Sequence, residues 1–248
     1  MKGILKSLFV VFCAALMAVP ASAQVYLGPR AGVNLASVST NQGGVETDFQ
    51  MGICGGLSLR WQIMKRLSIQ MEALYSQMGV VSTQQLQAGD VVTTIESTSF
   101  LDYVQAPLLL NYEIPLKPES LIPYRVKESF SSIHLYAGGF FGYGLGAASE
   151  TQTTVNNNDG TPAQVTTGAK ADIPSENFNP IDFGAMAGLG ISFRLDEEDK
   201  HRVGVDARYL LGFSNTSKVS GVTETNSAIQ GSIVYSMKLT KRTVRHIN

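Results

Sequence analysis

Side chains with the reactivity needed for catalysis or metal binding are few in this 248-residue chain. It has three histidines (His134, His201 and His246) and two cysteines, of which only Cys54 lies outside an N-terminal segment that we expect to be removed. One cysteine can form neither an intrachain disulfide nor a thiolate metal cluster. The sequence has no phosphate-binding glycine loop, no metal-ligand spacing and no basic aromatic patch. We therefore expect no enzyme activity, no cofactor, no metal site and no nucleic-acid partner.

A second group of chemically capable residues is ionisable and occupies every second position of otherwise apolar stretches. These residues are Arg30, Arg60, Glu72, Glu113, Asp182, Arg194, Asp206, Arg208 and Lys238. A period of two places such side chains on one face of a β-strand. Inside a narrow barrel they must pair, because an unpaired buried charge is costly. We predict an interior charge network of Arg30, Arg60, Glu72, Glu113, Asp206 and Arg208.

Within that network, Glu72 and Arg208 lie near mid-height on different strands, and we expect them to be partners. The resulting plug would close the barrel. A narrow ion path between the charges is the alternative.

The elements that must position these charges are long alternating strands. Residues 49–63 and 67–77 form two such runs around a polar corner at Lys65 and Arg66, which predicts a hairpin. Each run keeps one face apolar over about ten residues, the length that a tilted membrane-spanning strand needs. Similar runs predict strands at residues 27–35, 100–114, 133–147, 181–195, 203–213 and 229–239.

The connections between these strands are expected to alternate in length. Long polar loops are predicted at residues 37–48, 79–99, 149–180 and 214–226. The loop at 149–180 is interpreted as mobile and exposed, and the corner at 196–200 as a solvated turn. Long outer loops and short periplasmic turns are typical of outer-membrane barrels. The prediction is an all-β fold, an eight-stranded antiparallel up-and-down transmembrane β-barrel, with both termini in the periplasm.

Aromatic side chains on the apolar faces support a membrane-spanning barrel, because they fall at the two levels where interfacial girdles form. The outer level holds Phe49, Tyr75, Tyr143, Phe183 and Phe213 and the inner level holds Trp61, Tyr112, Phe193 and Tyr235. The opposite faces of 133–147 and 181–195 are rich in glycine, which predicts that another group approaches them closely.

The N-terminus predicts export. Lys2 and Lys6 precede an apolar run, and Ala21-Ser22-Ala23 matches a signal-peptidase site. We expect a signal peptide at residues 1–23, the barrel domain at 24–240 and a basic periplasmic tail at 241–248. The formal net charge of −1 and the lack of a second long apolar run disfavour nucleic-acid binders and helical membrane proteins.

Five stretches carry a resemblance to a known family: residues 67–77, 103–112, 135–143, 182–190 and 205–215. They resemble the PorT-like outer-membrane β-barrel proteins of Bacteroidota. The resemblance implies a small eight-stranded outer-membrane barrel and an accessory role in type IX-like protein secretion. The chain departs from that family in its long connection at 116–132 and in the tail that follows Leu239.

The expected function is a structural or interaction role of an integral outer-membrane barrel, carried by its outer loops. Its expected partners are outer-membrane lipid and other envelope or secretion proteins. Small barrels that modify lipid A need a histidine near the outer rim, whereas all three histidines are predicted at or beyond the periplasmic end. The alternatives are a soluble exported lipocalin-like binder, with its apolar faces inside, and a narrow passive pore.

Overall fold

The computed structural model describes residues 24–41, 43–88, 91–116, 131–157, 162–174, 178–196 and 198–239. The predicted signal peptide at 1–23, the basic tail at 241–248 and most of the 116–132 connection lie outside these residues. The described part forms ten strands and contains no helix long and apolar enough to cross a membrane. The strands are β1 (Gln24–Thr40), β2 (Val45–Gln62), β3 (Leu67–Ala88), β4 (Val91–Leu116), β5 (Ser131–Asn157), β6 (Pro162–Thr167), β7 (Ala171–Asp172), β8 (Ile181–Arg194), β9 (His201–Gly212) and β10 (Glu224–Lys238).

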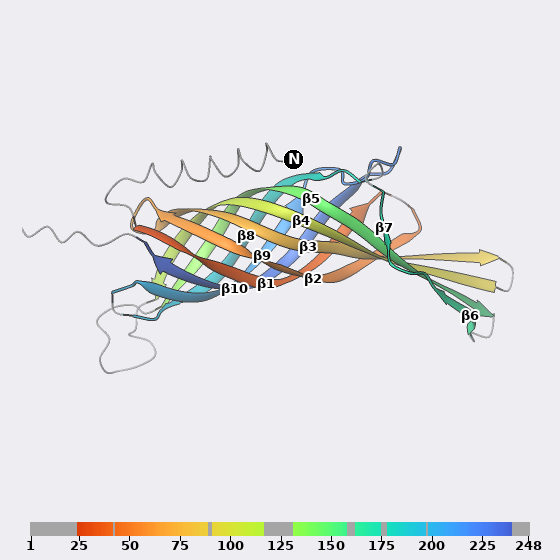
Figure 1. Cartoon of the computed structure of the whole chain (residues 1–248), viewed down its shortest axis with the longest axis horizontal. Helices are drawn as coiled ribbons and strands as arrows, with labels where there is room; N and C mark the ends of the chain where they lie inside the picture. Colours follow the sequence, from red (N-terminus) through yellow and green to blue (C-terminus); the bar gives the residue numbers. More distant parts are fainter. Residues whose placement is uncertain are drawn as a thin grey trace, which may run out of the picture.

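Eight of these strands close into an antiparallel ring in the order β1, β2, β3, β4, β5, β8, β9, β10. The closing pair joins β1 to β10, from Tyr26 opposite Lys238 to Thr40 opposite Glu224. The short strands β6 and β7 pair with β5 outside the ring. Figure 1 shows the tilted strands of the closed barrel. The predicted eight-stranded up-and-down barrel is confirmed.

Both ends of the described chain lie at one end of the barrel. The Leu239 amide donates to the Val25 carbonyl at 2.8 Å, and Gln24 pairs with Gln62. The short corners at 63–66 and 195–200 lie at this end too, since the Lys238 amide donates to the Lys200 carbonyl at 2.8 Å. We call it the terminal end and the opposite one the distal end.

The predicted loops at the distal end are largely wrong. β3 continues to Ala88 and β4 begins at Val91, so most of 79–99 is strand rather than loop. β5 continues to Asn157, and β6 and β7 occupy further parts of 149–180. The predicted loop at 37–48 shortens to 41–44. These segments are polar yet rich in threonine and valine, whose β-branched side chains suit strands.

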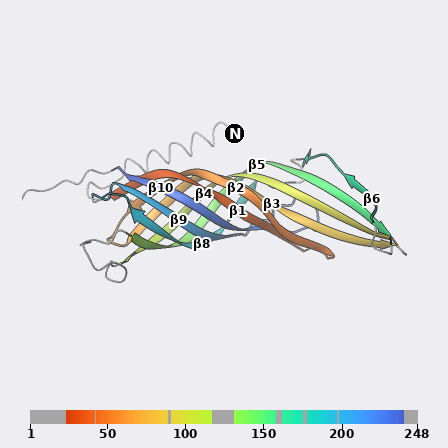
Figure 2. The ribbon, with the colours of Figure 1, turned by 90° about the horizontal axis from the view of Figure 1, so that it is seen from below.

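The extended strands form a sheet that projects beyond the ring (Figures 1 and 2). We call this sheet, made of residues 80–88 of β3, 91–100 of β4, 148–157 of β5 and all of β6, the distal sheet. β3 pairs with β4 up to Ala88 opposite Val91, and β4 pairs with β5 up to Val91 opposite Asn157. The distal sheet is therefore a hydrogen-bonded continuation of the barrel wall.

The barrel wall turns its apolar side outward. Leu108, Leu189 and Ile233 are 56%, 60% and 62% exposed, whereas Leu109, the neighbour of Leu108, is only 1% exposed. Charged side chains lie inside instead, with Arg30 and Arg208 at 2% and 1% exposure. The soluble lipocalin-like alternative is therefore wrong, because it requires the apolar faces inside and the polar faces in water.

The interior is packed in layers. A cluster of buried apolar side chains fills the barrel on the distal side of its charged centre, and includes Met78, Tyr103, Phe140 and Met186. The glycine-rich faces make room for this packing, as predicted. A Cβ atom on Gly188 would lie 2.7 Å from Cγ of Arg208, and one on Gly144 would lie 2.4 Å from Cε1 of Phe178.

Candidate functional site

Four charged residues from three strands, β1, β3 and β9, meet in the centre of the barrel, and we call them the central cluster: Arg30, Glu72, Asp206 and Arg208. Arg208 donates to both oxygens of Glu72, at 2.8 and 3.1 Å. Arg30 donates to both oxygens of Asp206, at 2.7 and 2.6 Å. Arg30 also lies 3.5 Å from Glu72, and Arg208 lies 3.3 Å from Asp206. Two positive and two negative charges thus balance in a site closed to solvent.

The strand register explains how such bulky side chains fit. Asp206 stands between Gly190 and Ser232 on the adjacent strands, and Arg208 has Gly188 on one side. These small neighbours leave the interior volume to the charged side chains. The Ser232 hydroxyl also accepts a hydrogen bond from Arg30 at 2.9 Å. The arrangement is rigid because each charge has at least two partners.

A second charged group lies toward the terminal end, and we call it the terminal cluster: Tyr26, Arg60, Glu113, Asp199 and Arg202. Arg202 donates to Glu113 at 3.0 and 3.1 Å and to Asp199 at 2.6 and 2.7 Å. The Tyr26 hydroxyl donates to Asp199 at 2.8 Å. The structure thus brings Arg30, Glu72, Asp206 and Arg208 together but places the other two predicted network residues, Arg60 and Glu113, in this separate group.

Three members of the terminal cluster, Tyr26, Asp199 and Arg202, were not predicted from the sequence. Asp199 was assigned to a solvated turn, which is wrong, because only 14% of its side chain is exposed. Burial opposes ionisation of Asp199, but the hydrogen bonds and charge of Arg202 outweigh it and hold the pKa of this carboxyl below its usual value of 3.8. Arg202 precedes the predicted strand at 203–213. Arg202 is separated from Asp206 and Arg208 by an even number of positions, so it belongs to the same inward-facing side of the strand. This spacing could have identified it.

Near the distal end, a single carboxylate is held by neutral groups. Asp182 accepts from Ser214 at 2.5 Å and from Asn226 at 2.9 Å. Asn226 also donates to the Tyr103 hydroxyl at 3.2 Å. The Tyr103 ring contacts Phe178 edge-to-face, with the ring centres 6.0 Å apart. Phe178 covers this layer and borders a distal cavity of about 280 Å³ that Glu224 also lines.

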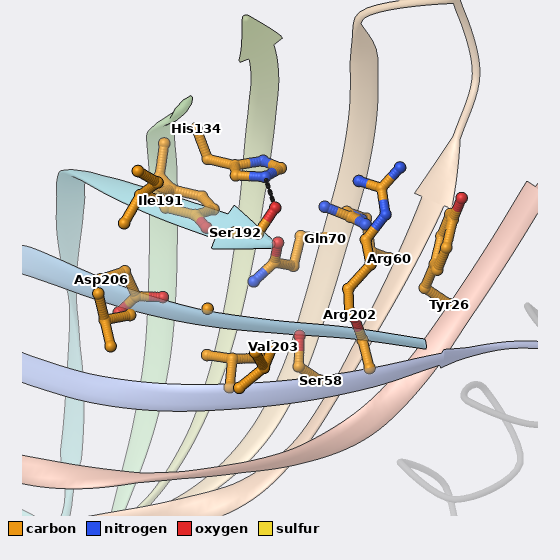
Figure 3. A pocket seen from close by; sticks show the side chains of 15 residues that line it. Tyr26, Ser58, Arg60, Gln70, His134, Ile191, Ser192, Arg202, Val203 and Asp206 are labelled. Carbon is orange, nitrogen blue, oxygen red and sulfur yellow. Dashed lines mark hydrogen bonds between the residues drawn. The ribbon is translucent and has the colours of Figure 1, made fainter. Parts of the chain in front are cut away.

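A smaller cavity of about 40 Å³ lies between the central and terminal clusters (Figure 3). His134 lies beside it, with Nε2 2.7 Å from the Ser192 hydroxyl and Nδ1 3.0 Å from Oδ1 of Asn111. This order of hydroxyl, imidazole and amide is that of an activated nucleophile. The cavity has room for only a few water molecules. Among the described residues, no three potential ligands are grouped to hold a metal ion.

The predicted girdle residues lie on the outer surface of the barrel. Tyr75, Val104, Tyr143 and Ile181 follow one another across four adjacent strands, in register. At the other level, Phe193 and Tyr235 both stand opposite Val203. Trp61 and Tyr143 are half-buried, and the other seven predicted residues are exposed by more than a third: Phe49, Tyr75, Tyr112, Phe183, Phe193, Phe213 and Tyr235.

The chain is similar, at low sequence identity, to several proteins of known structure. The chain is similar to Neisserial surface protein A, with 12% identity over 86% of this chain and 97% of that one and a TM-score of 0.34. It is similar to OprG from Pseudomonas aeruginosa, with 12% identity over 90% and 98% and a TM-score of 0.40. It is also similar to Ail of Yersinia pestis, with 10% identity over 85% and 97% and a TM-score of 0.28.

No curated protein sequence matches the chain. The model of one protein family, described as the outer membrane protein beta-barrel domain, matches residues 20–218. That match spans most of the chain and agrees with the closed ring and its apolar outer surface. The chain therefore belongs to the outer membrane protein β-barrel domain family, and its location is the outer membrane.

Proposed function

We propose that the protein is a non-enzymatic anchor in the outer membrane that presents the distal sheet outside the cell as a contact surface for other macromolecules. The observation that carries this proposal is the continuity of the distal sheet with a barrel whose centre is filled. A polar sheet held by main-chain hydrogen bonds to a membrane barrel keeps a fixed position above the lipid.

The distal sheet has the composition of a surface that stays in water. Its strands are dominated by Ser, Thr and Gln, and hydroxyl groups face one another across strands, as Ser97 and Thr151 do at 3.4 Å. In the described part of the chain, β6 is paired only with β5, so its other edge presents main-chain groups to solvent. An extended segment of a partner could add to this edge.

The proposal includes the orientation of the barrel in the outer membrane. Short corners at 63–66 and 195–200 and both described chain ends share the terminal end, and short connections are typical of the periplasmic side. We therefore assign the terminal end to the periplasm and the distal sheet to the cell exterior.

We also propose that the protein has no enzyme activity, because of how His134 is placed in the barrel interior. His134 is 1% exposed and its ring nitrogens are both engaged, and the cavity beside it is too small for a substrate.

The resemblance to PorT-like proteins, and with it an accessory role in type IX-like secretion, stays a prediction. Measuring secretion in a strain that lacks this protein would test that role.

Two substitutions in a Cys54→Ser background test the orientation. Glu96→Cys lies on the exposed side of the distal sheet and Lys65→Cys lies in an exposed corner at the terminal end. A membrane-impermeant maleimide added to intact cells should label the first cysteine and not the second. Labelling of the second cysteine alone would show that the barrel has the opposite orientation in the membrane.

A photo-activatable cross-linking residue tests the contact function. Placed at Glu96, it should form adducts with protein or polysaccharide on living cells, whereas at the lipid-facing Leu108 it should yield only lipid adducts. The proposal fails if position 96 forms no macromolecular adduct beyond that seen at position 108.

A further inference from the structure

One arginine in the terminal cluster lacks the partners that every other buried charge of that cluster has. Arg60 stands on β2, two residues before the strand ends at Gln62. Its Nη2 atom is shielded from solvent and has no hydrogen-bond partner. Its guanidinium carbon lies 4.6 Å from the centre of the Tyr26 ring. A stacking contact leaves the in-plane N–H donors of a guanidinium unsatisfied.

The carboxylates near Arg60 are already engaged by Arg202. Asp199 accepts two bonds from Arg202 and one from Tyr26. Glu113 accepts from Arg202 through both oxygens and from Ser132 at 2.8 Å. Among the described residues, no carboxylate oxygen lies within ion-pair distance of Arg60.

A second positive charge lies close to the first. The Arg202 guanidinium carbon is 4.9 Å from the centre of the same Tyr26 ring. Figure 3 shows both guanidinium groups on the cavity side of Tyr26. Arg202 is flanked by its two carboxylate partners, Glu113 and Asp199. Arg60 has no hydrogen-bonded carboxylate of its own among the described residues, so a further negative charge beside its guanidinium would stabilise it.

The cavity of about 40 Å³ beside these arginines supplies the space for that charge. One water molecule needs roughly 10–15 Å³ of such space, so the cavity has room for a small ion or a few waters. Ser58, Ser192 and Ser236 are among the residues that line it. Asp206 also faces it, but this carboxylate is engaged by Arg30 and Arg208.

We propose that this cavity is a binding site for a small inorganic anion such as chloride, with Arg60 as its principal ligand and Arg202 as a supporting charge. The anion would accept from the Nη2 donor of Arg60, which has no other hydrogen-bond partner. It would enter from the terminal end, because Arg60 lies within two residues of that rim.

Anomalous diffraction tests the site directly in the wild-type protein. Crystals of the full barrel grown in bromide should show an anomalous peak in this cavity beside Arg60. A cavity that contains only water gives no such peak, and that result would overturn the proposal. This readout does not depend on whether any variant folds.

Thermal unfolding in detergent tests the role of Arg60. At constant ionic strength, replacing gluconate, which is too large for the cavity, with chloride should give a saturable rise in the unfolding midpoint. The rise should be lost in Arg60→Gln and kept in Arg66→Gln, a matched change at an exposed position of the adjacent corner. An equal chloride response in wild type and Arg60→Gln would refute the assignment. Arg60→Lys, which keeps the charge, should restore part of the response.

Discussion

Arg208 holds Glu72 across the barrel through two hydrogen bonds, although the two residues are 136 positions apart in the chain. The same carboxylate is 3.5 Å from Arg30. Asp206 in turn contacts both arginines. The Glu72–Arg208 pair is therefore half of a neutral four-residue cluster. Removing one partner leaves a net charge inside the barrel, whereas removing both partners keeps the cluster neutral.

Removing one charge of the pair should be much more damaging than removing both. Glu72→Met leaves two arginines facing Asp206 alone, and we expect a loss of roughly 3–5 kcal/mol in the free energy of unfolding. In the double variant with Arg208→Met, the bidentate Arg30–Asp206 pair remains neutral, so the loss should be clearly smaller. Denaturant unfolding in lipid vesicles measures the cycle, with exposed Glu46→Gln as control. Equal losses in the single and double variants would contradict a coupled cluster.

The assignment of the lipid-facing side of the strands can be tested with residues near the middle of the membrane. Leu108→Arg and Leu189→Arg should each cost roughly 2–4 kcal/mol in folding free energy, the cost of arginine at the bilayer midplane. Leu86→Arg, at an exposed leucine of the distal sheet, is the matched control outside the membrane and should be nearly neutral. Gly188→Arg should also be damaging, for a different reason, since even a Cβ there meets the Ala207 carbonyl at 2.3 Å. If Leu108→Arg folds in lipid as well as wild type, the assigned face is wrong.

The filled interior predicts that the barrel conducts very little. Wild-type protein in planar bilayers should give no large, stable conductance steps, because the central cluster occupies the lumen of an eight-stranded barrel. Replacing Arg30, Glu72, Asp206 and Arg208 together with serine should open measurable steps if the barrel folds. Large steps from the wild-type protein would favour the passive pore instead.

The alternation of residues was enough to predict the barrel and the side of each strand that meets lipid. Leu108 and Leu109 are both leucines, yet their opposite exposure follows from the period of two. The same parity, together with similar height, led to the expectation that Glu72 and Arg208 meet, and they lie 2.8 Å apart at closest approach.

Parity alone does not determine which charges become partners. Arg30 meets Asp206 because β1 closes on β10, which places residues 176 positions apart at the same height. That registration depends on the stagger of the whole ring, which no single stretch of sequence encodes. Asp199 was misjudged because its corner has the composition of an exposed turn, whereas the mouth of the barrel buries it.

The distal strands were missed for a related reason. Where both faces of a sheet meet water, the apolar–polar alternation that identifies membrane strands disappears. Residues 91–100 retain another signal, the β-branched side chains of Val, Thr and Ile at six positions. That signal indicates strand structure but not the length of the projection.

The close contact between Gly144 and Phe178 gives a prediction with an internal control. Gly144→Ala would place a methyl group 2.4 Å from the Phe178 ring, so the ring must move, and we expect a loss of roughly 1–3 kcal/mol in the free energy of unfolding. Gly146→Ala, two residues further along β5, meets nothing within 4 Å and should be nearly neutral. In a Phe178→Ala background the Gly144→Ala change should cost little. A similar loss with and without the ring would refute this contact.

Asp199 should make the stability of the terminal end depend on pH. Its backbone φ of 55° is in the left-handed region, which aspartate and asparagine tolerate. Because its folded-state pKa is below the usual value of 3.8, the ionised carboxylate stabilises the fold above about pH 4, and this contribution is lost as the pH falls through the folded pKa. Asp199→Asn removes the charge that Arg202 and Tyr26 contact, and should cost roughly 1.5–3 kcal/mol at pH 7.

The difference in unfolding free energy between wild type and Asp199→Asn should therefore shrink when the pH is lowered from 7 to 3. Glu198→Gln is the control, because its ion pair with Lys200 is at the surface, with side-chain exposures of 70% and 58%, and such pairs contribute little. Chemical unfolding in detergent at a series of pH values measures all three proteins. A difference between wild type and Asp199→Asn that stays constant from pH 7 to pH 3 would show that the interactions of Asp199 with Arg202 and Tyr26 do not depend on its charge.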